Sequence, residues 1–228
     1  ENLIIEKSIN LISRASFDED VNGVIDGWMA YDDGYVVANE HIANTIIDGS
    51  AQLNGELLAS VILINTPREI VNCITPVIKG FTIIGGEGTS VKIEGGEDNY
   101  VMKGGGFYSF NASPTFNYNA FLNNGSGFES DISNGGGGAF NNGEKLEYEQ
   151  SYWGGAPNYT ECVDSRGWFN MISNAWGDNN ASYGNTLSSQ NDQNGIDMSE
   201  SFFDVYNCPD DEVTQVWVNT DSGTDVNF

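Results

Sequence analysis

Basic residues are scarce in this chain, and their scarcity excludes several functions at the outset. The 228 residues contain eight Lys and Arg against 33 Asp and Glu, which gives a formal net charge of −25. A protein this acidic repels nucleic-acid phosphates and anionic lipid surfaces, so neither is expected as a partner. The sequence also lacks an apolar run of about 18 residues, so we expect no membrane insertion.

Cysteine and histidine are nearly absent, which removes most metal and redox chemistry. The three cysteines form no CxxC pair and no cluster with the single histidine, His41, so zinc, haem and iron–sulfur sites are not expected. Cys162 and Cys208 lie in the same C-terminal third and are the candidates for a disulfide. Cys73 is left over in the apolar run IVNCI, where we expect a buried, inert thiol.

Glycine, asparagine and short β-branched runs are abundant. The chain holds 28 Gly and 28 Asn, which favour turns over long helices, while 39% hydrophobic residues are too many for a disordered acidic tail. Short apolar runs bounded by Gly, Asn, Asp or Pro are typical of strands. The runs are Asn2–Ile5, Ile9–Ile12, Asn44–Asp48, Val61–Asn65, Val77–Ile84, Val91–Ile93, Tyr100–Met102, Gly106–Phe110 and Phe116–Leu122.

The spacing of these runs predicts a solenoid. The middle runs recur irregularly, on the order of every 20 residues, and a solenoid tolerates such irregularity because loops of any length can leave a corner. The polar stretch 15–43 and the Gly- and Asn-rich stretch 123–151 are then long loops. The pattern is less regular from about Gly143, so we expect a coil stack at 1–142 and a looser C-terminal part at 143–228. The alternative is a stack that continues through 143–228 with longer loops.

Several stretches resemble secreted bacterial right-handed parallel β-helix repeat proteins. ENLIIEKSINLIS at Glu1–Ser13 is similar to their opening coils, and NTIIDGS at Asn44–Ser50 and VIKGFTIIGGEGT at Val77–Thr89 are similar to their inner coils. GGGFYSFNASPTFNYNAFLNN and GGGGAFNN, at 104–124 and 135–142, resemble their repeat units. The resemblance implies an all-β, right-handed parallel β-helix in a secreted or cell-surface protein. It implies no single function, because the family includes lyases, hydrolases, adhesins and structural proteins.

The C-terminal stretch VWVNTDSGTDVNF, at Val216–Phe228, resembles the first strand of such modules although it comes last here. Two interpretations remain open. The chain could be cut from a tandem array, or this strand could complete the coil stack of a neighbouring copy. The second interpretation predicts that the protein's partner is itself, joined head to tail.

The strongest ligand motif is DEDVNGVIDGW, which begins at Asp18. Its oxygen-bearing residues follow the spacing of a calcium loop, with a glycine at the sharp turn. The final bidentate Glu of such a loop is replaced by Met29, and Asp32 or Asp33 could supply the missing carboxylate. We predict a shortened calcium loop, with an acidic solvent-exposed turn as the alternative. The expected ligands are Asp18, Asp20, Asn22, the carbonyl of Val24, Asp26 and Asp32.

The sequence contains no recognisable catalytic motif and therefore favours a non-catalytic role. His41 has no nucleophile motif near it, no arginine lies in a lyase-like motif, and the paired carboxylates of a glycosidase are not assembled. Carbohydrate binding by stacked aromatic rings is another candidate, unless these aromatics form the core of the C-terminal part. The residues concerned are Tyr152, Trp153, Trp168 and Trp176.

Three functions therefore stand as hypotheses. The first is an extracellular structural or surface-assembly protein, stabilised by calcium and built into head-to-tail filaments. The second is a surface adhesin or carbohydrate-binding module, and the third is a polysaccharide lyase or glycoside hydrolase.

Overall fold

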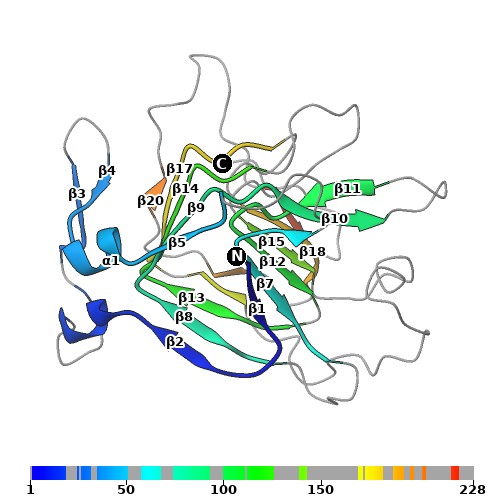
Figure 1. Cartoon of the computed structure of the whole chain (residues 1–228), viewed down its shortest axis with the longest axis horizontal. Helices are drawn as coiled ribbons and strands as arrows, with labels where there is room; N and C mark the ends of the chain where they lie inside the picture. The colour runs from blue at the N-terminus through cyan, green and yellow to red at the C-terminus, as the bar shows by residue number, and fades with distance from the viewer. Residues whose placement is uncertain are drawn as a thin grey trace.

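The chain folds as a β-solenoid whose coils are built from three parallel sheets, with two small antiparallel sheets beside them (Figure 1). The computed structural model describes residues 2–18, 25, 27–31, 35–50, 58–67, 74–92, 100–110, 112–125, 139–142, 169–171, 173–181, 187–192, 196–197, 202–203 and 217–220.

Each of the three sheets collects strands from the whole length of the chain. Sheet 1 contains β1 (Leu3–Ile5), β7 (Ile62–Asn65), β12 (Phe107–Phe110), β15 (Ala139–Asn142), β18 (Leu187–Asp192) and β21 (Trp217–Thr220). Sheet 2 contains β2 (Asn10–Ile12), β8 (Val77–Lys79), β13 (Thr115–Asn117), β16 (Phe169–Asn170) and β19 (Ile196–Asp197). Sheet 3 contains β5 (Ile46–Asp48), β9 (Thr82–Ile84), β14 (Ala120–Leu122), β17 (Ala175–Gly177) and β20 (Phe202–Phe203).

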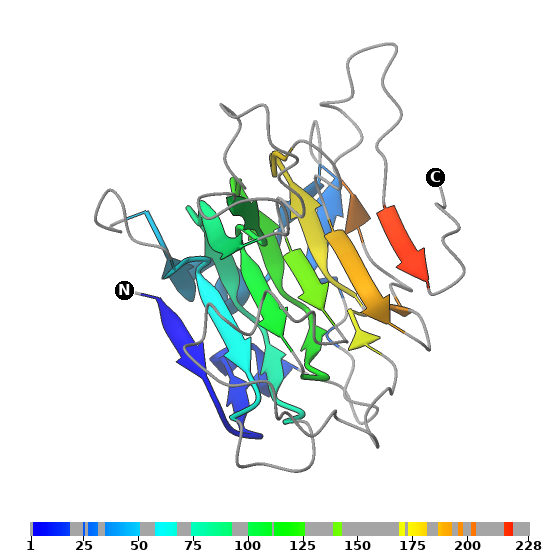
Figure 2. The ribbon, with the colours of Figure 1, turned by 90° about the vertical axis from the view of Figure 1, so that its right-hand side faces the viewer.

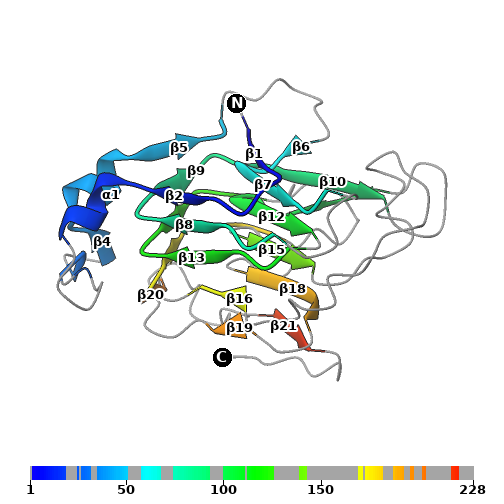
Figure 3. The ribbon, with the colours of Figure 1, turned by 90° about the horizontal axis from the view of Figure 1, so that it is seen from below.

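The chain visits the sheets in a fixed order, and each visit to all three makes one coil. β1, β2 and β5 form the first coil, β7, β8 and β9 the second, and β12, β13 and β14 the third. Figure 2 shows the strands of sheet 1 side by side, from β1 at one end to β21 at the other. Seen from the first coil, the chain runs clockwise as it recedes (Figures 1 and 3), so the parallel β-helix is right-handed, as expected for parallel crossovers.

Equivalent corners of successive coils use the same backbone conformation. Between sheets 2 and 3 a single residue with positive φ turns the chain, and this residue is Gly80, Tyr118 or Ser173 in the second, third and fourth coils. After sheet 3 the corresponding residues are Gly85, Asn123 and Asp178. Glycine and asparagine adopt this conformation at little cost, which is one physical reason for their abundance.

The first coil carries a long insertion at the corner where later coils use one residue. Between β2 and β5 the chain forms the 3-10 helix η1 (Arg14–Asp18), the hairpin of β3 (Met29–Tyr31) and β4 (Tyr35–Val37), and the helix α1 (Glu40–Asn44). The side-chain oxygen of Asn39 caps α1 by accepting the backbone N–H groups of His41 and Ile42. The polar loop predicted at 15–43 is therefore an insertion with its own secondary structure, which lies beside the coil stack in Figure 1.

Two of the expected runs do not join the coils. Val91–Ile93 and Tyr100–Met102 overlap β10 (Gly88–Lys92) and β11 (Tyr100–Lys103), which pair antiparallel with each other and, through β10, with β6 (Leu58–Ala59). The reason is topological. The segment between β9 and β12 doubles back as a hairpin before the chain re-enters sheet 1, so these strands lie outside the three parallel sheets (Figure 3).

The coil stack extends beyond residue 142 in the described part of the chain. β16 to β21 all pair parallel with earlier strands of the three sheets. The less regular sequence after Gly143 thus still supplies parallel strands to the three sheets, at wider intervals along the chain and with a register shift between β18 and β21.

Candidate functional site

The interior of the coil stack is filled by a column of aromatic rings. Phe107 stacks on Phe116 with their ring centroids 4.3 Å apart, and Phe121 stacks on Trp176 at 4.4 Å with an interplanar angle of 12°. All four side chains are buried, together with aliphatic neighbours such as Ile62. These rings are a structural core rather than a binding surface.

Trp176 belongs to this column, which corrects its assignment as a carbohydrate-binding residue. Only 3% of its surface is exposed, so its ring faces are covered by protein and cannot stack on a sugar. The alternative interpretation, an aromatic core, holds at this position. The other candidates for sugar binding, Tyr152, Trp153 and Trp168, lie outside the described residues.

Asparagine side chains form a ladder at the corner between sheets 2 and 3. The carboxamide of Asn119 accepts the backbone N–H of Phe81 at 3.1 Å and donates to the carbonyl of Ile78 at 3.0 Å and to Oδ1 of Asn174 at 3.2 Å. Asn174 in turn donates to the carbonyl of Phe116 at 2.7 Å. Both asparagines are fully buried, so each satisfies backbone groups that would otherwise be buried without partners.

A second ladder occupies the corner after sheet 3. Asn124 accepts the N–H of Gly86 at 3.1 Å and donates to Oδ1 of Asn179 at 3.1 Å, and Asn179 donates to the carbonyl of Phe121 at 2.8 Å. Asn124 is buried and already fully engaged, so these amides hold coils together and leave little capacity for a ligand.

The predicted calcium loop begins inside the first-coil insertion. Asp18 is the last residue of η1. The other expected ligands lie outside the described residues, namely Asp20, Asn22, Val24, Asp26 and Asp32. The flanks of the loop are anchored, because Ala15 before it and Ile25 and Trp28 within or just after it are buried in a second apolar cluster.

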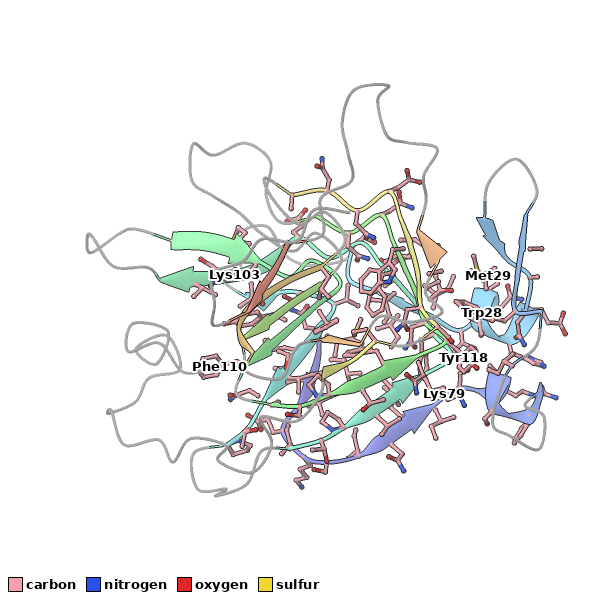
Figure 4. All side chains as sticks on the ribbon, turned by 180° about the vertical axis from the view of Figure 1, so that it is seen from behind. Trp28, Met29, Lys79, Lys103, Phe110 and Tyr118 are labelled. Carbon is pink, nitrogen blue, oxygen red and sulfur yellow. The ribbon has the colours of Figure 1, made fainter. Side chains whose placement is uncertain are left out.

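The anchor of the insertion lies at the corner of the third coil. Trp28 meets Tyr118 edge-on with ring centroids 5.8 Å apart, and Nζ of Lys79 lies 5.1 Å from the centroid of the same Tyr118 ring. Figure 4 shows these three residues together where the insertion meets the coil stack. The insertion is also tied to the second coil, because Thr82 donates from its hydroxyl to the carbonyl of Ile42 at 2.8 Å and from its N–H to that of Thr45.

Potential metal ligands do not cluster in the described part of the chain. No set of three or more His, Cys, Asp or Glu residues there could hold a metal ion. Cys73, Cys162 and Cys208 lie outside the described residues, so the disulfide and the buried-thiol predictions stay predictions. Sequence reasoning missed one buried polar contact, in which the hydroxyl of Ser60 lies 2.7 Å from the hydroxyl of Thr89 in β10.

One carboxylate at a corner has an altered acidity. Hydrogen bonds from the side chain and backbone of Ser50 lower the pKa of Asp48, and the backbone N–H of Ser50 lies 2.8 Å from Oδ1 of Asp48. Asp48 is solvent-exposed at the end of β5, so this carboxylate stabilises the turn into the next segment and does not resemble a catalytic acid.

The first coil lies at one end of the described stack and leaves strand edges unpaired. β1, β2 and β5 each pair with a strand on one side only, namely β7, β8 and β9. Of their inward-facing residues, Ile5 is buried, whereas Leu3, Leu11 and Ile47 are only partly buried, although the residues they pair with in the second coil are completely buried. Within the described residues, the end of the core is therefore partly open to solvent at this coil.

Outward-facing isoleucines surround this open end. Ile4 of β1, Ile12 of β2 and Ile46 of β5 are 51%, 45% and 51% exposed. The exposed large hydrophobic residues of the described chain all fall in the first coil and its insertion; the other two are Ile9 and Phe17. The signal was present in the sequence, because the runs NLII, INLI and TIID lack the alternation of a strand with one wet face.

Comparisons of the chain with protein families, with curated proteins and with solved structures gave no match. Within the described residues, no helix has the length and apolar character needed to cross a membrane.

Proposed function

We propose that this chain is an extracellular structural module, of the kind found in secreted bacterial β-helix repeat proteins, that joins head to tail with copies of itself. The single observation that carries this proposal is the open first coil, with three unpaired strand edges and a rim of exposed isoleucines. Unpaired edges and apolar patches of this kind are surfaces on which another chain adds strands.

The interior supports a structural rather than a catalytic role. Aromatic rings and asparagine ladders fill the described coils, and these groups stabilise the stack without offering a nucleophile or an acid–base pair. The parallel strands give the two ends of the stack different surfaces, so a contact between ends is heterologous and continues into a filament.

Calcium is the proposed cofactor, bound by the loop that starts at Asp18. Its support is the spacing of oxygen ligands in the sequence together with the buried flanks Ala15, Ile25 and Trp28, which fix the base of the loop on the coil stack. The net charge of −25 also supports a calcium-rich extracellular setting, because a divalent cation screens repulsion between neighbouring copies.

The test is assembly of the purified chain, followed by light scattering and electron microscopy across a concentration series with calcium and salt. We expect filaments from the wild type and a loss of assembly in Ile46→Lys, which places a charge at the open end. Phe17→Lys is the matched control, because Phe17 is 78% exposed in η1 but lies away from the strand edges. A chain that stays monomeric throughout contradicts the proposal. Glycan binding by that monomer would favour an adhesin, and polysaccharide turnover would favour an enzyme.

A further inference from the structure

The described residues of the first-coil insertion, within 13–45, lie over a column of small side chains on the outer face of sheet 3. Phe121 and Trp176 point into the core. The residues before them on the same strands, Ala120 and Ala175, therefore point outward. Both alanines are still buried, because they belong to one apolar cluster with side chains of the insertion. The insertion contributes Ala15, Ile25, Trp28 and Ile42 to this cluster.

The insertion is attached to several coils at once. In the column beneath it, Thr82 belongs to the second coil, Ala120 to the third and Ala175 to the fourth, and the parallel pairing of their strands places them side by side. The hydrogen bonds of Thr82 and the contact of Trp28 with Tyr118 fix the insertion on the second and third coils. In Figure 3 it runs along the side of the stack beside β2, β8 and β13. Because the insertion begins and ends in the first coil, it ties that coil sideways to three others.

The base of the insertion fits the second coil closely enough to require a glycine there. A Cβ at Gly80 would collide with Oγ of Ser13 and lie 3.0 Å from Cβ of Ala15. The same Oγ accepts the backbone N–H of Ala15 at 3.1 Å, which fixes the direction of the chain as it leaves β2. The insertion is therefore seated on the stack from its first residues.

The first coil has few other contacts that hold it in place. Its strands β1, β2 and β5 each contain three residues and, in the described part of the chain, pair on one side only. Strands this short are stable only as part of a larger packed structure. The whole insertion also separates β2 from β5, and a long connection costs more conformational entropy to close than the short corners of the later coils. Anchoring the insertion on sheet 3 offsets this cost and keeps β5 beside β9.

We propose that the insertion is a strap that holds the first coil on the stack. With the strap seated, β1, β2 and β5 are ordered and present their free edges. When the strap leaves sheet 3, the first coil unfolds locally, while the coils beneath it stay folded through their aromatic column and asparagine ladders. The strap itself does not depend on self-assembly. Its consequence for assembly rests on the proposed function, because the docking edge then exists only while the strap is seated.

The test is hydrogen exchange of backbone amides, followed by NMR in a dilute sample. Ala175→Leu places a larger side chain beneath the strap on the fourth coil and leaves the first coil's own residues unchanged. Trp28→Ala removes the ring that meets Tyr118 and leaves the stack unchanged. Thr115→Leu is the matched control, because Thr115 is partly exposed on sheet 2 and lies outside the cluster beneath the strap.

Two amides report on the first coil and one on the coils beneath it. The N–H of Leu3 and the N–H of Gly49 each donate to a carbonyl of the second coil at 2.9 Å. The N–H of Ile62 donates from the second coil to the third at 3.0 Å. We expect both strap variants to speed exchange of the first-coil amides about tenfold and to change the rate at Ile62 by less than about twofold. The control should change none of the three.

First-coil amides that keep their wild-type rates in both strap variants would overturn the inference, since the first coil would then hold itself. Equal acceleration at Ile62 would overturn it too, because the insertion would then be part of one cooperative core.

Light scattering is the second readout. If the wild type assembles, both strap variants should need a higher concentration than Thr115→Leu, and equal concentrations would overturn the link between strap and assembly. A wild type that never assembles would refute the proposed function, whereas the exchange rates would still decide whether the strap holds the first coil.

Discussion

At the scale of single residues, buried asparagine side chains hold successive coils together. Asn119 and Asn124 each connect three coils through one buried carboxamide, which both accepts and donates to backbone groups. Buried backbone groups need such partners, because leaving one unsatisfied costs about 1–3 kcal/mol. Asparagine at these corners is therefore explained by stability alone.

We expect Asn119→Ala to destabilise the fold by about 2–5 kcal/mol, because it leaves the N–H of Phe81 and the carbonyl of Ile78 buried without this partner. Urea unfolding followed by circular dichroism measures the change. Asn180→Ala is the control, since Asn180 is exposed, and should shift stability by no more than about 0.5 kcal/mol. Equal effects of the two substitutions would contradict a specific role for the ladder.

Asp48 makes the stability of its corner depend on pH in the acid range. Hydrogen bonds from Ser50 hold the pKa of Asp48 below its usual value, so its contribution is present at neutral pH and is lost as the pH falls through the lowered pKa. Ser50→Ala removes the side-chain bond and should move the pKa of Asp48 upward, measured by NMR titration of its carboxyl group. A pKa that does not move would show that the backbone N–H of Ser50 alone is responsible.

At the scale of elements, the short strands are stable only because they stack. Most contain two to four residues, and each gains its stability from pairing with equivalent strands and from the aromatic column that runs between the sheets. The first-coil insertion follows the same principle, since its helix and hairpin are held by Trp28 on Tyr118 and by the hydrogen bonds of Thr82.

Removing one ring from the aromatic column should destabilise the fold strongly. We expect Phe121→Ala to lower the free energy of unfolding by about 3–5 kcal/mol, because Phe121 is fully buried and contacts both Phe116 and Trp176. Chemical denaturation measures the loss. Phe17→Ala removes the same ring from an exposed position and should change stability by less than about 0.5 kcal/mol. A small effect at Phe121 would mean that the column repacks.

Calcium should stabilise the insertion if the loop at Asp18 binds it. Binding to the native state alone raises stability by about 2.7 kcal/mol at a hundredfold excess over the dissociation constant. Thermal melting of the wild type with calcium and with chelator measures this difference, which should vanish in Asp20→Ala. Glu87→Ala, an exposed acidic position away from the loop, should keep it. If millimolar calcium leaves the melting temperature of the wild type unchanged, the prediction is wrong.

At the scale of the whole molecule, charge and the open coil act in opposite directions. The exposed isoleucines and strand edges favour association, whereas a net charge of −25 opposes it over a distance set by ionic strength. We expect the concentration needed for assembly to fall as sodium chloride rises from about 0.01 M to 0.15 M, where the screening length shrinks from about 30 Å to about 8 Å. Light scattering at fixed protein concentration checks this, and assembly that weakens with salt would contradict it.

The sequence alone determined the type of fold and most of its strands. Runs such as Val61–Asn65, Val77–Ile84 and Phe116–Leu122 became strands because short β-branched segments between turn residues have few other stable conformations. The resemblance at Glu1–Ser13 and Val77–Thr89 also fits the observed coils. Local chemistry was sufficient here, because turn residues and apolar alternation act within a few positions of one another.

Only the tertiary structure decided which apolar residues are covered and which are not. Trp176 and Ile46 both lie in short apolar runs, yet Trp176 is buried between coils whereas Ile46 is half-exposed at the edge of the first. The antiparallel pairing of β10 with β11 likewise depends on where the chain returns to the stack. Burial depends on neighbours that are distant in the sequence. The exposed isoleucines of the first coil, on which the proposed assembly rests, are therefore decided by how the coils stack.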